Sequence, residues 1–170
     1  MLTEIYIYFA KKITPSRAKH ILNVKKLRKN AAHSLLRKSG VIIPPSSCIV
    51  APFHFGSGNI AIGENTYINY DCICIDYSAI KIGSNVLIGP RVTLSTVTHP
   101  TEPTARLSNQ RNIYSPITIE DNVFIGTNVT ILPGVTIGAN SVIAANSVVT
   151  SSVPADCLYA GTPARFKKSL

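Results

Sequence analysis

Four histidines are the side chains of this sequence best suited to exchange a proton at neutral pH. His20 and His33 fall in a lysine-rich stretch, where we expect both at the surface. His54 stands between two phenylalanines in APFHFG, which favours a structural or pocket-lining role. His99 stands in STVTHPTEP, beside two prolines, where a regular pattern stops. Because an imidazole on a loop can face a cleft and act as a general base, His99 is the candidate catalytic residue.

The cysteines do not have the spacing of a metal site. There are four of them, Cys48, Cys72, Cys74 and Cys157. Cys72 and Cys74 lie on one face of a strand, but no second pair completes a zinc site. We expect free buried thiols, a reducing compartment and no bound metal. A zinc-dependent carbonic anhydrase is disfavoured, because that chemistry needs three ligands and only two histidines follow residue 41.

The positive charge belongs to the N-terminal segment. The formal net charge is +9, and residues 1–45 hold ten Lys or Arg against Glu4 alone. The remaining 125 residues carry seven basic and seven acidic side chains. No apolar stretch reaches the 18 residues of a spanning helix, and the opening residues lack a secretory signal. We therefore expect a cytoplasmic protein, with peripheral contact at the inner membrane as an open alternative.

The N-terminal segment, residues 1–40, is predicted to be a basic helical leader. Ile21, Val24, Leu27 and further apolar residues recur three or four apart, which predicts one helix over residues 15–39. Ser16 is the expected start and Gly40 the expected end. Such a helix either lies on an anionic membrane surface or packs its apolar stripe on the domain. Nucleic acid is not an expected partner, because no aromatic interleaving or reader motif accompanies the charge.

From residue 41 onward the sequence repeats with a period of six. Six aliphatic residues follow one another at this spacing: Ile119, Ile125, Ile131, Ile137, Ile143 and Val149. A smaller residue lies four positions after each: Val123, Val129, Val135, Ser141, Ser147 and Val153. A period of six indicates a parallel β-helix, in which three six-residue faces make one coil and coils stack on their neighbours. We predict an all-β domain over residues 41–170 with about five coils, interrupted by a loop over residues 97–116.

The repeats resemble those of the hexapeptide-repeat acyltransferases, whose coils are left-handed. The resemblance rests on IKIGSNVLIGPRVTLSTVTHP, on SPITIEDNVFIGTNVTILPGVTIGANSVIAANSVVTSSVPA and on YAGTPARF. It covers about residues 50–168 and is strongest to galactoside, maltose and nodulation-factor O-acetyltransferases. Residues 1–40 look more like the basic leader of capsule and exopolysaccharide acetyltransferases. The resemblance implies a homotrimer, with sites between subunits and acetyl-CoA as the acyl donor.

Site residues follow from the resemblance position by position. His99 matches the general base, and direct acetyl transfer to a saccharide hydroxyl is favoured over an acyl-enzyme. Three residues are implied on the acceptor side, Asn69, Tyr67 and Asp76. Six are implied on the donor side, Gly126, Thr127, Ala145, Thr150, Arg165 and Lys168. Tyr77 stands where the family carries a second, sugar-contacting aspartate, which puts galactoside or maltose as acceptor in doubt.

Two other functions stay open at this point. One is N-acetylation of an amino sugar or an antibiotic, which uses the same coil and the same histidine. The other is a non-catalytic β-helix scaffold, held at a membrane by residues 1–40. The basic leader favours an acidic or membrane-attached acceptor, such as a capsule or lipopolysaccharide component.

Overall fold

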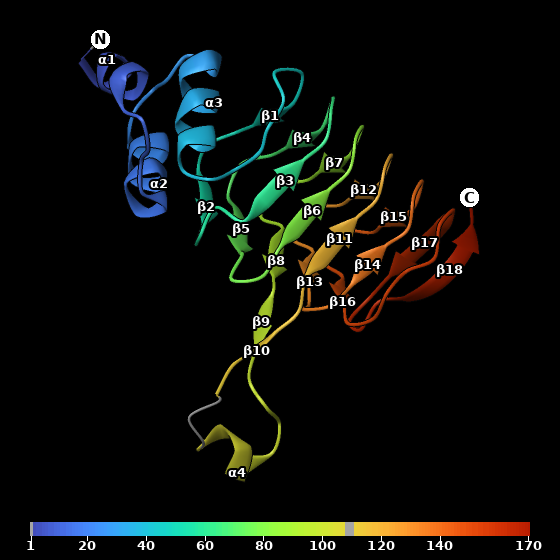
Figure 1. Ribbon diagram of the computed structural model, residues 1–170. Helices are drawn as coiled ribbons and strands as arrows, with labels where there is room; N and C mark the ends of the chain where they lie inside the picture. Colours follow the sequence, from blue (N-terminus) through green and yellow to red (C-terminus); the bar gives the residue numbers. More distant parts are fainter. Residues whose placement is uncertain (1, 108–110) are drawn as a thin grey trace.

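Three sheets form the faces of a prism in the computed structural model, which describes residues 2–107 and 111–170 (Figure 1). Their strands pair parallel, except that the last strand of the chain is antiparallel to its neighbour. The first face contains β3 (Ile60–Ile62), β6 (Ile80–Ile82), β11 (Ile117–Ile119) and β14 (Thr136–Ile137). The second face contains β1 (Cys48–Ile49), β4 (Tyr67–Ile68), β7 (Leu87–Ile88), β12 (Phe124–Ile125), β15 (Val142–Ile143), β17 (Cys157–Ala160) and β18 (Arg165–Ser169). The third face contains β2 (Phe53–Phe55), β5 (Cys72–Ile75), β8 (Thr93–Ser95), β13 (Thr130–Ile131) and β16 (Val148–Val149). The chain visits the faces in this order, so it winds as a β-helix of about five turns.

The six-residue period corresponds to the buried positions of the prism. Ile119, Ile125 and Ile131 each expose at most 1% of their surface, and each stacks on the residue 18 positions later. The smaller residues four positions on are buried as well, including Ser141 and Ser147. Each coil therefore buries its apolar side chains against the next coil, as the sequence predicted.

The corners between faces are tight turns that need left-handed backbone. We call them the first corner (first to second face), the second corner (second to third) and the third corner (third to first). Asparagine supplies positive φ at the first corner, as at Asn122 and Asn140 with φ of 58° and 61°. The side-chain amide of Asn122 donates to that of Asn140 at 2.9 Å, so the coils are also bonded at their corners.

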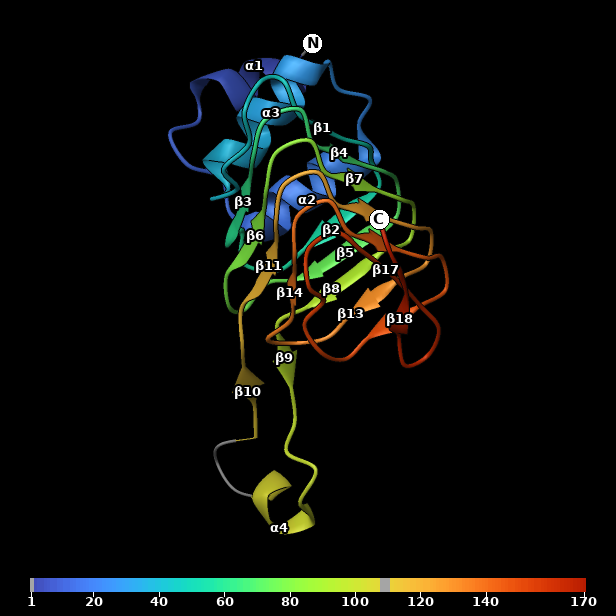
Figure 2. The same ribbon diagram turned by 90° about the vertical axis from the view of Figure 1, so that its right-hand side faces the viewer.

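The third corner is interrupted once, by a hairpin that extends away from the prism (Figure 2). β9 (Val97–Thr98) pairs antiparallel with β10 (Ile113–Tyr114), and the short helix α4 (Pro103–Arg106) lies beyond them. Residues 108–110 lie outside the described part of the chain. The prolines of this segment exclude it from the parallel ladders, because proline lacks the N–H that a ladder needs.

The N-terminal segment forms three helices, α1 (Leu2–Phe9), α2 (Pro15–Val24) and α3 (Lys29–Lys38), so the prediction of a single helix over residues 15–39 is wrong. Thr14, not Ser16, caps α2 by accepting a hydrogen bond from the Arg17 amide. The break before α3 is held by Glu4, which accepts hydrogen bonds from the backbone and guanidinium of Arg28. No local pattern could reveal that bond, because Glu4 is 24 residues away.

The helices α2 and α3 pack on the first coil of the prism and share its hydrophobic core. Asn23 of α2 exchanges two hydrogen bonds with the backbone of Phe53, at 3.1 and 2.9 Å. His33 is 4% exposed, which corrects the expectation of a surface residue, and burial together with Lys29 and Arg37 lowers its pKa. His20 is exposed as expected. None of the described helices is both long and apolar enough to cross a bilayer.

Candidate active site

His99 stands on the hairpin, one residue beyond β9. Its Nδ1 lies 2.8 Å from the carbonyl oxygen of Arg111, two residues before the returning strand β10. A carbonyl can only accept, so in the neutral ring Nδ1 carries the hydrogen and donates it. The exposed imidazole therefore has its Nε2 lone pair free to take a proton. Glu102, at the N-cap of α4, is exposed, and the group that orients the ring is the Arg111 carbonyl.

An aromatic pair lies at the base of the same hairpin. The ring of Tyr77, on the third corner, meets the ring of Tyr114 edge-on at 6.2 Å between centroids. Tyr114 pairs with Val97 across the hairpin, and alternation puts Val97 and His99 on the same side of the ribbon. Tyr77 and Tyr114 are 63% and 52% exposed. An aromatic wall therefore stands beside the imidazole, where a bound molecule can pack an apolar surface against it.

Asp76, which precedes Tyr77, is not available to a ligand. Its side chain is completely buried. One carboxylate oxygen accepts from the amides of Gly56 and Ser57 at 2.6 and 3.0 Å, and the other accepts from the amide of Asn59 at 2.7 Å. The expectation that Asp76 contacts the acceptor is therefore corrected: the carboxylate anchors the turn of residues 56–59 in the coil above.

The second corner brings together three of the six residues expected on the donor side, Gly126, Thr127 and Ala145. Backbone hydrogen bonds link Asn69 to Ile88, Gly89 to Ile125 and Gly126 to Ile143, which stacks these corners on successive coils. Thr127 and Ala145 are both exposed on this column. Asn69 is half-buried, and its side-chain oxygen accepts from the amide of Tyr70 at 2.9 Å.

Two glycines of this corner are required by the close stacking of the coils. A Cβ on Gly126 would lie 2.6 Å from the amide nitrogen of Ala145. A Cβ on Gly89 would lie 2.8 Å from the amide nitrogen of Thr127. In the coils of Gly126 and Ala145 the corner therefore presents small side chains and backbone, along which a long, flexible chain can lie close to peptide groups.

Arg165 and Lys168 lie on the last strand, β18, which is exposed along its whole length. Arg165 pairs with Ala160 of β17. The preceding residue, Tyr159, accepts a backbone hydrogen bond from Ala144 of the second corner. The Arg165 guanidinium is thus placed near the C-terminal end of that corner. Lys168 pairs with Leu158, further along the second face. Arg165 is therefore better placed than Lys168 to meet a ligand that runs along the second corner.

The remaining expected residues lie elsewhere. Thr150 is exposed on the third corner, after β16, on the same edge of the prism as the hairpin. Tyr67 points outward from the second face and is 40% exposed. It begins a row of exposed apolar side chains with Leu87 and Phe124, which the strand register places side by side.

The two chemical parts of the site do not meet within one chain. The third face separates the second corner from the third, and the six residues from Thr127 to Leu132 span about 15–20 Å when extended. The hairpin with His99 then extends further from the prism (Figure 2). A site that uses His99 together with Thr127 therefore needs two copies of the chain.

Two features of this region were not predicted. Arg91 occupies the positive-φ position of the second corner, with φ of 58°, where neighbouring coils carry Asp71, Asn128 and Asn146. Alignment of the coils would have singled it out as a cation in a column of Asn and Asp. The Arg111 carbonyl had no detectable signal, because backbone acceptors are common to all residues.

Other chemistries find little support among the described residues. Burial raises the pKa of the Cys72 thiol to about 11 and raises that of Cys74 as well, so neither is a nucleophile at neutral pH. His54 points outward from β2 and is exposed. Within residues 2–107 and 111–170, no three His, Cys, Asp or Glu side chains gather as a metal site would require.

Comparison with known proteins points to one kind of enzyme. Residues 116–151 match the family model "Hexapeptide repeat of succinyl-transferase". Nodulation protein L of Rhizobium meliloti is 40% identical over 136 residues, which cover 79% of this chain and 74% of that protein. Galactoside O-acetyltransferase of Escherichia coli is 43% identical over 134 residues, 78% of this chain but 65% of that longer protein.

A solved structure agrees over nearly the whole chain. The hexapeptide-repeat acetyltransferase of Vibrio cholerae, crystallised with acetyl coenzyme A, superposes with a TM-score of 0.87 at 43% identity. The match covers 92% of this chain and 85% of that one. Since the prism begins only near residue 41, a match of this extent includes part of the N-terminal helices.

Proposed function

This chain belongs to the hexapeptide-repeat acetyltransferase family, in its sugar O-acetyltransferase branch, and we propose that it transfers an acetyl group from acetyl-CoA to a saccharide hydroxyl. The observation that carries the proposal is the hydrogen bond from His99 Nδ1 to the Arg111 carbonyl. That bond leaves Nε2 as a proton acceptor at the one place where the coil is interrupted. The test is acetyl transfer from acetyl-CoA to a panel of saccharides, measured by release of free CoA.

In the proposed reaction, Nε2 of His99 removes the proton of the acceptor hydroxyl. The hydroxyl oxygen attacks the thioester carbon, and a tetrahedral oxyanion forms. The backbone amide of Thr127 is the proposed donor to this oxyanion. The C–S bond then breaks, the ester remains on the acceptor, and the leaving thiolate takes the proton from the imidazolium. Direct transfer is supported by the protonated state of Cys72 and Cys74.

The donor would lie along the second corner. Thr127 and Ala145 offer exposed backbone and little side-chain bulk to the pantetheine arm, and the buried Gly126 lets their two coils approach closely. At the end of this corner, Arg165 is available to the phosphates of the adenosine end, with Lys168 further along the same strand. Thr150, on the third corner, would reach the same donor only from a neighbouring subunit, because the third face separates the two corners.

We further propose a homotrimer of left-handed coils. The separation of His99 from Thr127 supports an oligomer, since closed symmetry lets the hairpin of one subunit cover the second corner of the next. The exposed apolar row of Tyr67, Leu87 and Phe124 is the proposed contact surface, because a row of this kind is costly to leave in water. Tyr67 would then border the acceptor pocket from the subunit interface.

The shared site has a sharp test in mixed oligomers. His99→Ala removes the base, and Ala145→Trp fills the second corner without touching the core, since Ala145 is exposed. Each variant alone is expected to be inactive. Co-expressed in equal amounts, they should recover about a quarter of the wild-type activity, because one ordered subunit pair in four has both intact parts.

The control for this test is each inactive variant mixed with itself in the same way. No recovery in the mixture of the two variants would mean that one chain supplies both parts. Size-exclusion chromatography with light scattering on the mixture would establish that the variants assemble together.

The acceptor is proposed to be a saccharide with an apolar face or an apolar substituent. Tyr77 and Tyr114 present aromatic surface beside the imidazole, and a sugar ring packs its C–H face on such rings. Asn69 is proposed to contact the acceptor from the neighbouring subunit by its amide. A capsule, lipopolysaccharide or other polysaccharide component is the proposed acceptor class.

A further inference from the structure

The outward side of helix α1 is apolar and uncovered. Leu2, Ile5 and Phe9 follow one another three and four residues apart, so they form one stripe along the helix. They are 81%, 46% and 75% exposed, and the neighbouring Tyr8 is 77% exposed. Ile7, on the opposite side, is 1% exposed and packs into the core. A helix with apolar residues on both sides is normally buried on both, so the outer stripe lacks a partner in the isolated chain.

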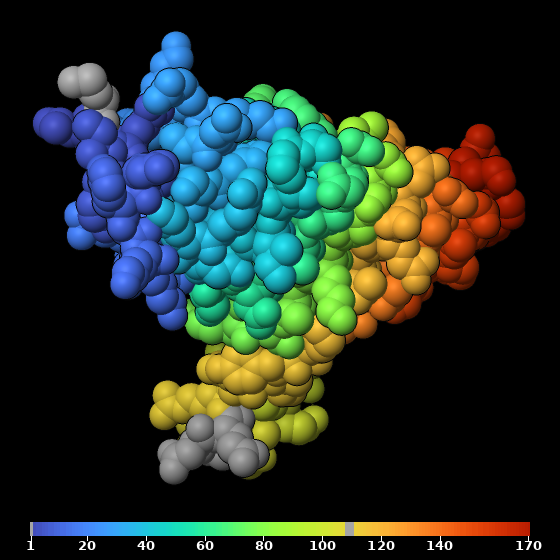
Figure 3. Space-filling model, turned by 45° about the horizontal axis from the view of Figure 1, so that its top comes forward, coloured from blue at the N-terminus to red at the C-terminus, as the bar shows by residue number. Residues whose placement is uncertain are grey.

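This stripe lies at one end of the molecule. Figure 1 shows α1 outermost, at the end opposite to the C-terminus, and Figure 3 shows the same helix at the edge of the surface. A flat partner can therefore approach α1 without meeting the prism. We call these three residues together with Tyr8 the α1 stripe.

Positive charge surrounds the stripe. The Arg17 guanidinium lies 4.5 Å from the centre of the Tyr6 ring, and Lys38 donates from Nζ to the carbonyls of Ile7 and Tyr8. Lys11 and Lys12 follow the helix directly and are exposed. The single acid of the segment, Glu4, forms an ion pair with Arg28, and the hydrogen bonds from Arg28 lower the pKa of Glu4.

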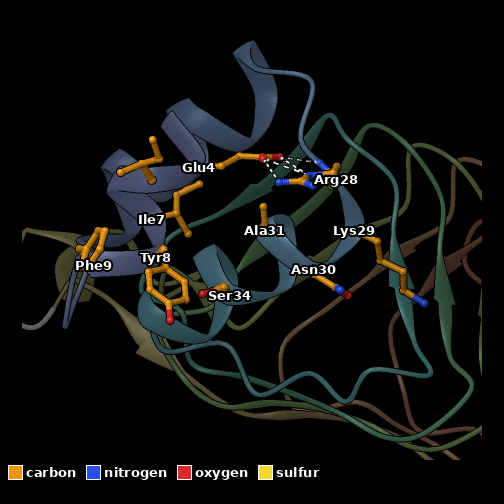
Figure 4. Close-up of a pocket in the computed structure, with 10 residues that line it drawn as sticks. Glu4, Ile7, Tyr8, Phe9, Arg28, Lys29, Asn30, Ala31 and Ser34 are labelled. Atoms are coloured by element: carbon orange, nitrogen blue, oxygen red, sulfur yellow. Dashed lines mark hydrogen bonds and ion pairs between the residues drawn. The ribbon is translucent and has the colours of Figure 1, made fainter. Parts of the chain in front are cut away.

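A groove of about 570 Å³ adjoins the stripe, between α1 and α3 (Figure 4). Its α1 side is mostly apolar, with Ile5, Ile7, Tyr8 and Phe9, and its one acid, Glu4, is paired with Arg28. Its α3 side is polar, with Lys29 and further residues of that helix's first turns. Such a groove suits a molecule that has an apolar chain and an anionic head.

We propose that the α1 stripe docks the protein on an anionic phospholipid surface. Leu2, Ile5, Tyr8 and Phe9 enter the boundary between headgroups and acyl chains, and the surrounding lysines and arginines contact lipid phosphates. A second copy of the chain is a poorer occupant, because two segments with ten basic residues and one acid each repel one another. The helices α2 and α3, whose apolar sides are packed on the prism, do not take part in insertion.

A tryptophan reporter tests insertion directly, because the chain contains no tryptophan. Phe9→Trp places the reporter on the stripe, and Phe166→Trp is the matched control on an exposed aromatic of the opposite end. With vesicles of phosphatidylcholine and phosphatidylglycerol we expect a blue shift of the Phe9→Trp emission and none for Phe166→Trp. Equal shifts in both variants, or no shift in either, would overturn the proposal.

The contribution of positive charge is tested with the same vesicles in a flotation assay. Lys11→Gln with Lys12→Gln should lower the partition coefficient about 25-fold, at about fivefold for each lysine removed from the surface. Lys81→Gln with Lys167→Gln removes the same charge elsewhere and should leave partitioning within about twofold. Binding to pure phosphatidylcholine as strong as to the mixed vesicles would contradict selection by charge.

A blue shift that grows with protein concentration in the absence of vesicles would mean that a second copy covers the stripe, and would also overturn the proposal. Acetyl transfer in vesicle-free buffer is measured alongside. Its loss would concern the proposed reaction, whereas loss of flotation alone would concern the α1 stripe.

Discussion

The second and third corners of the prism are built from the same six-residue repeat but differ in regularity. At the second corner every coil turns within a few residues, and Gly89 and Gly126 bring successive coils into contact. At the third corner one coil leaves the ladder for the β9–β10 hairpin, which carries His99. The regular corner produces a column of stacked turns, while the interruption supplies a side chain held away from the ladder. A uniform solenoid offers binding surface, but an acid–base group needs a place where the uniformity is broken.

The largest effect is expected at the interrupted corner. His99→Ala should lower kcat for acetyl transfer about 10²- to 10⁴-fold, because the hydroxyl proton then has no acceptor in the site. His54→Ala is the matched control, since His54 is also exposed but lies on the regular third face. We expect it to keep activity within about twofold. The measurement is CoA release at saturating acetyl-CoA, with circular dichroism to establish that both variants are folded.

If His54→Ala lowered kcat as much as His99→Ala, the loss of activity could not be assigned to the interrupted corner. Full activity of folded His99→Ala would exclude it as the general base.

A smaller effect is expected from Asp76→Asn, also at the third corner. The buried carboxylate accepts three backbone N–H groups, and an amide nitrogen in place of one oxygen would face a donor. We expect the free energy of unfolding to fall by about 3 kcal/mol, measured by urea denaturation. Asp121→Asn, at an exposed position of the first corner, is the control and should cost less. In the folded enzyme KM for the acceptor should not change; an increase of tenfold or more would restore Asp76 as an acceptor contact.

The same contrast between regular and interrupted structure explains what the sequence could reveal. The faces were predictable because one aliphatic residue returns every six positions and each is buried on the next, as Ile125 and Ile143 are. The start of the hairpin was predictable because Pro100 and Pro103 cannot join a ladder. The orientation of His99 was not, since it depends on a backbone carbonyl 12 residues away.

The prediction of a single N-terminal helix was wrong for a related reason. Their apolar spacing is continuous across the break, and the break is stabilised by Glu4 from another helix. The burial of Asp76 was hidden in the same way, because its partners are amides about 20 residues earlier in the chain. Periodic burial can be read along the sequence, whereas single long-range hydrogen bonds leave no pattern in it.

The smallest effect separates the second corner from the first. Gly126→Ala and Gly138→Ala each place a Cβ against backbone of the next coil, at 2.6 and 2.4 Å from an amide nitrogen. Both should lower the free energy of unfolding by similar amounts, about 1–3 kcal/mol, because the coils must separate slightly. Only Gly126 lies on the corner proposed to hold the donor, so only Gly126→Ala should raise KM for acetyl-CoA, by several-fold. Gly138→Ala therefore serves as the control for a general loosening of the coils. If both variants raised this KM equally, the donor would not distinguish the two corners, and the proposed path along the second corner would be wrong.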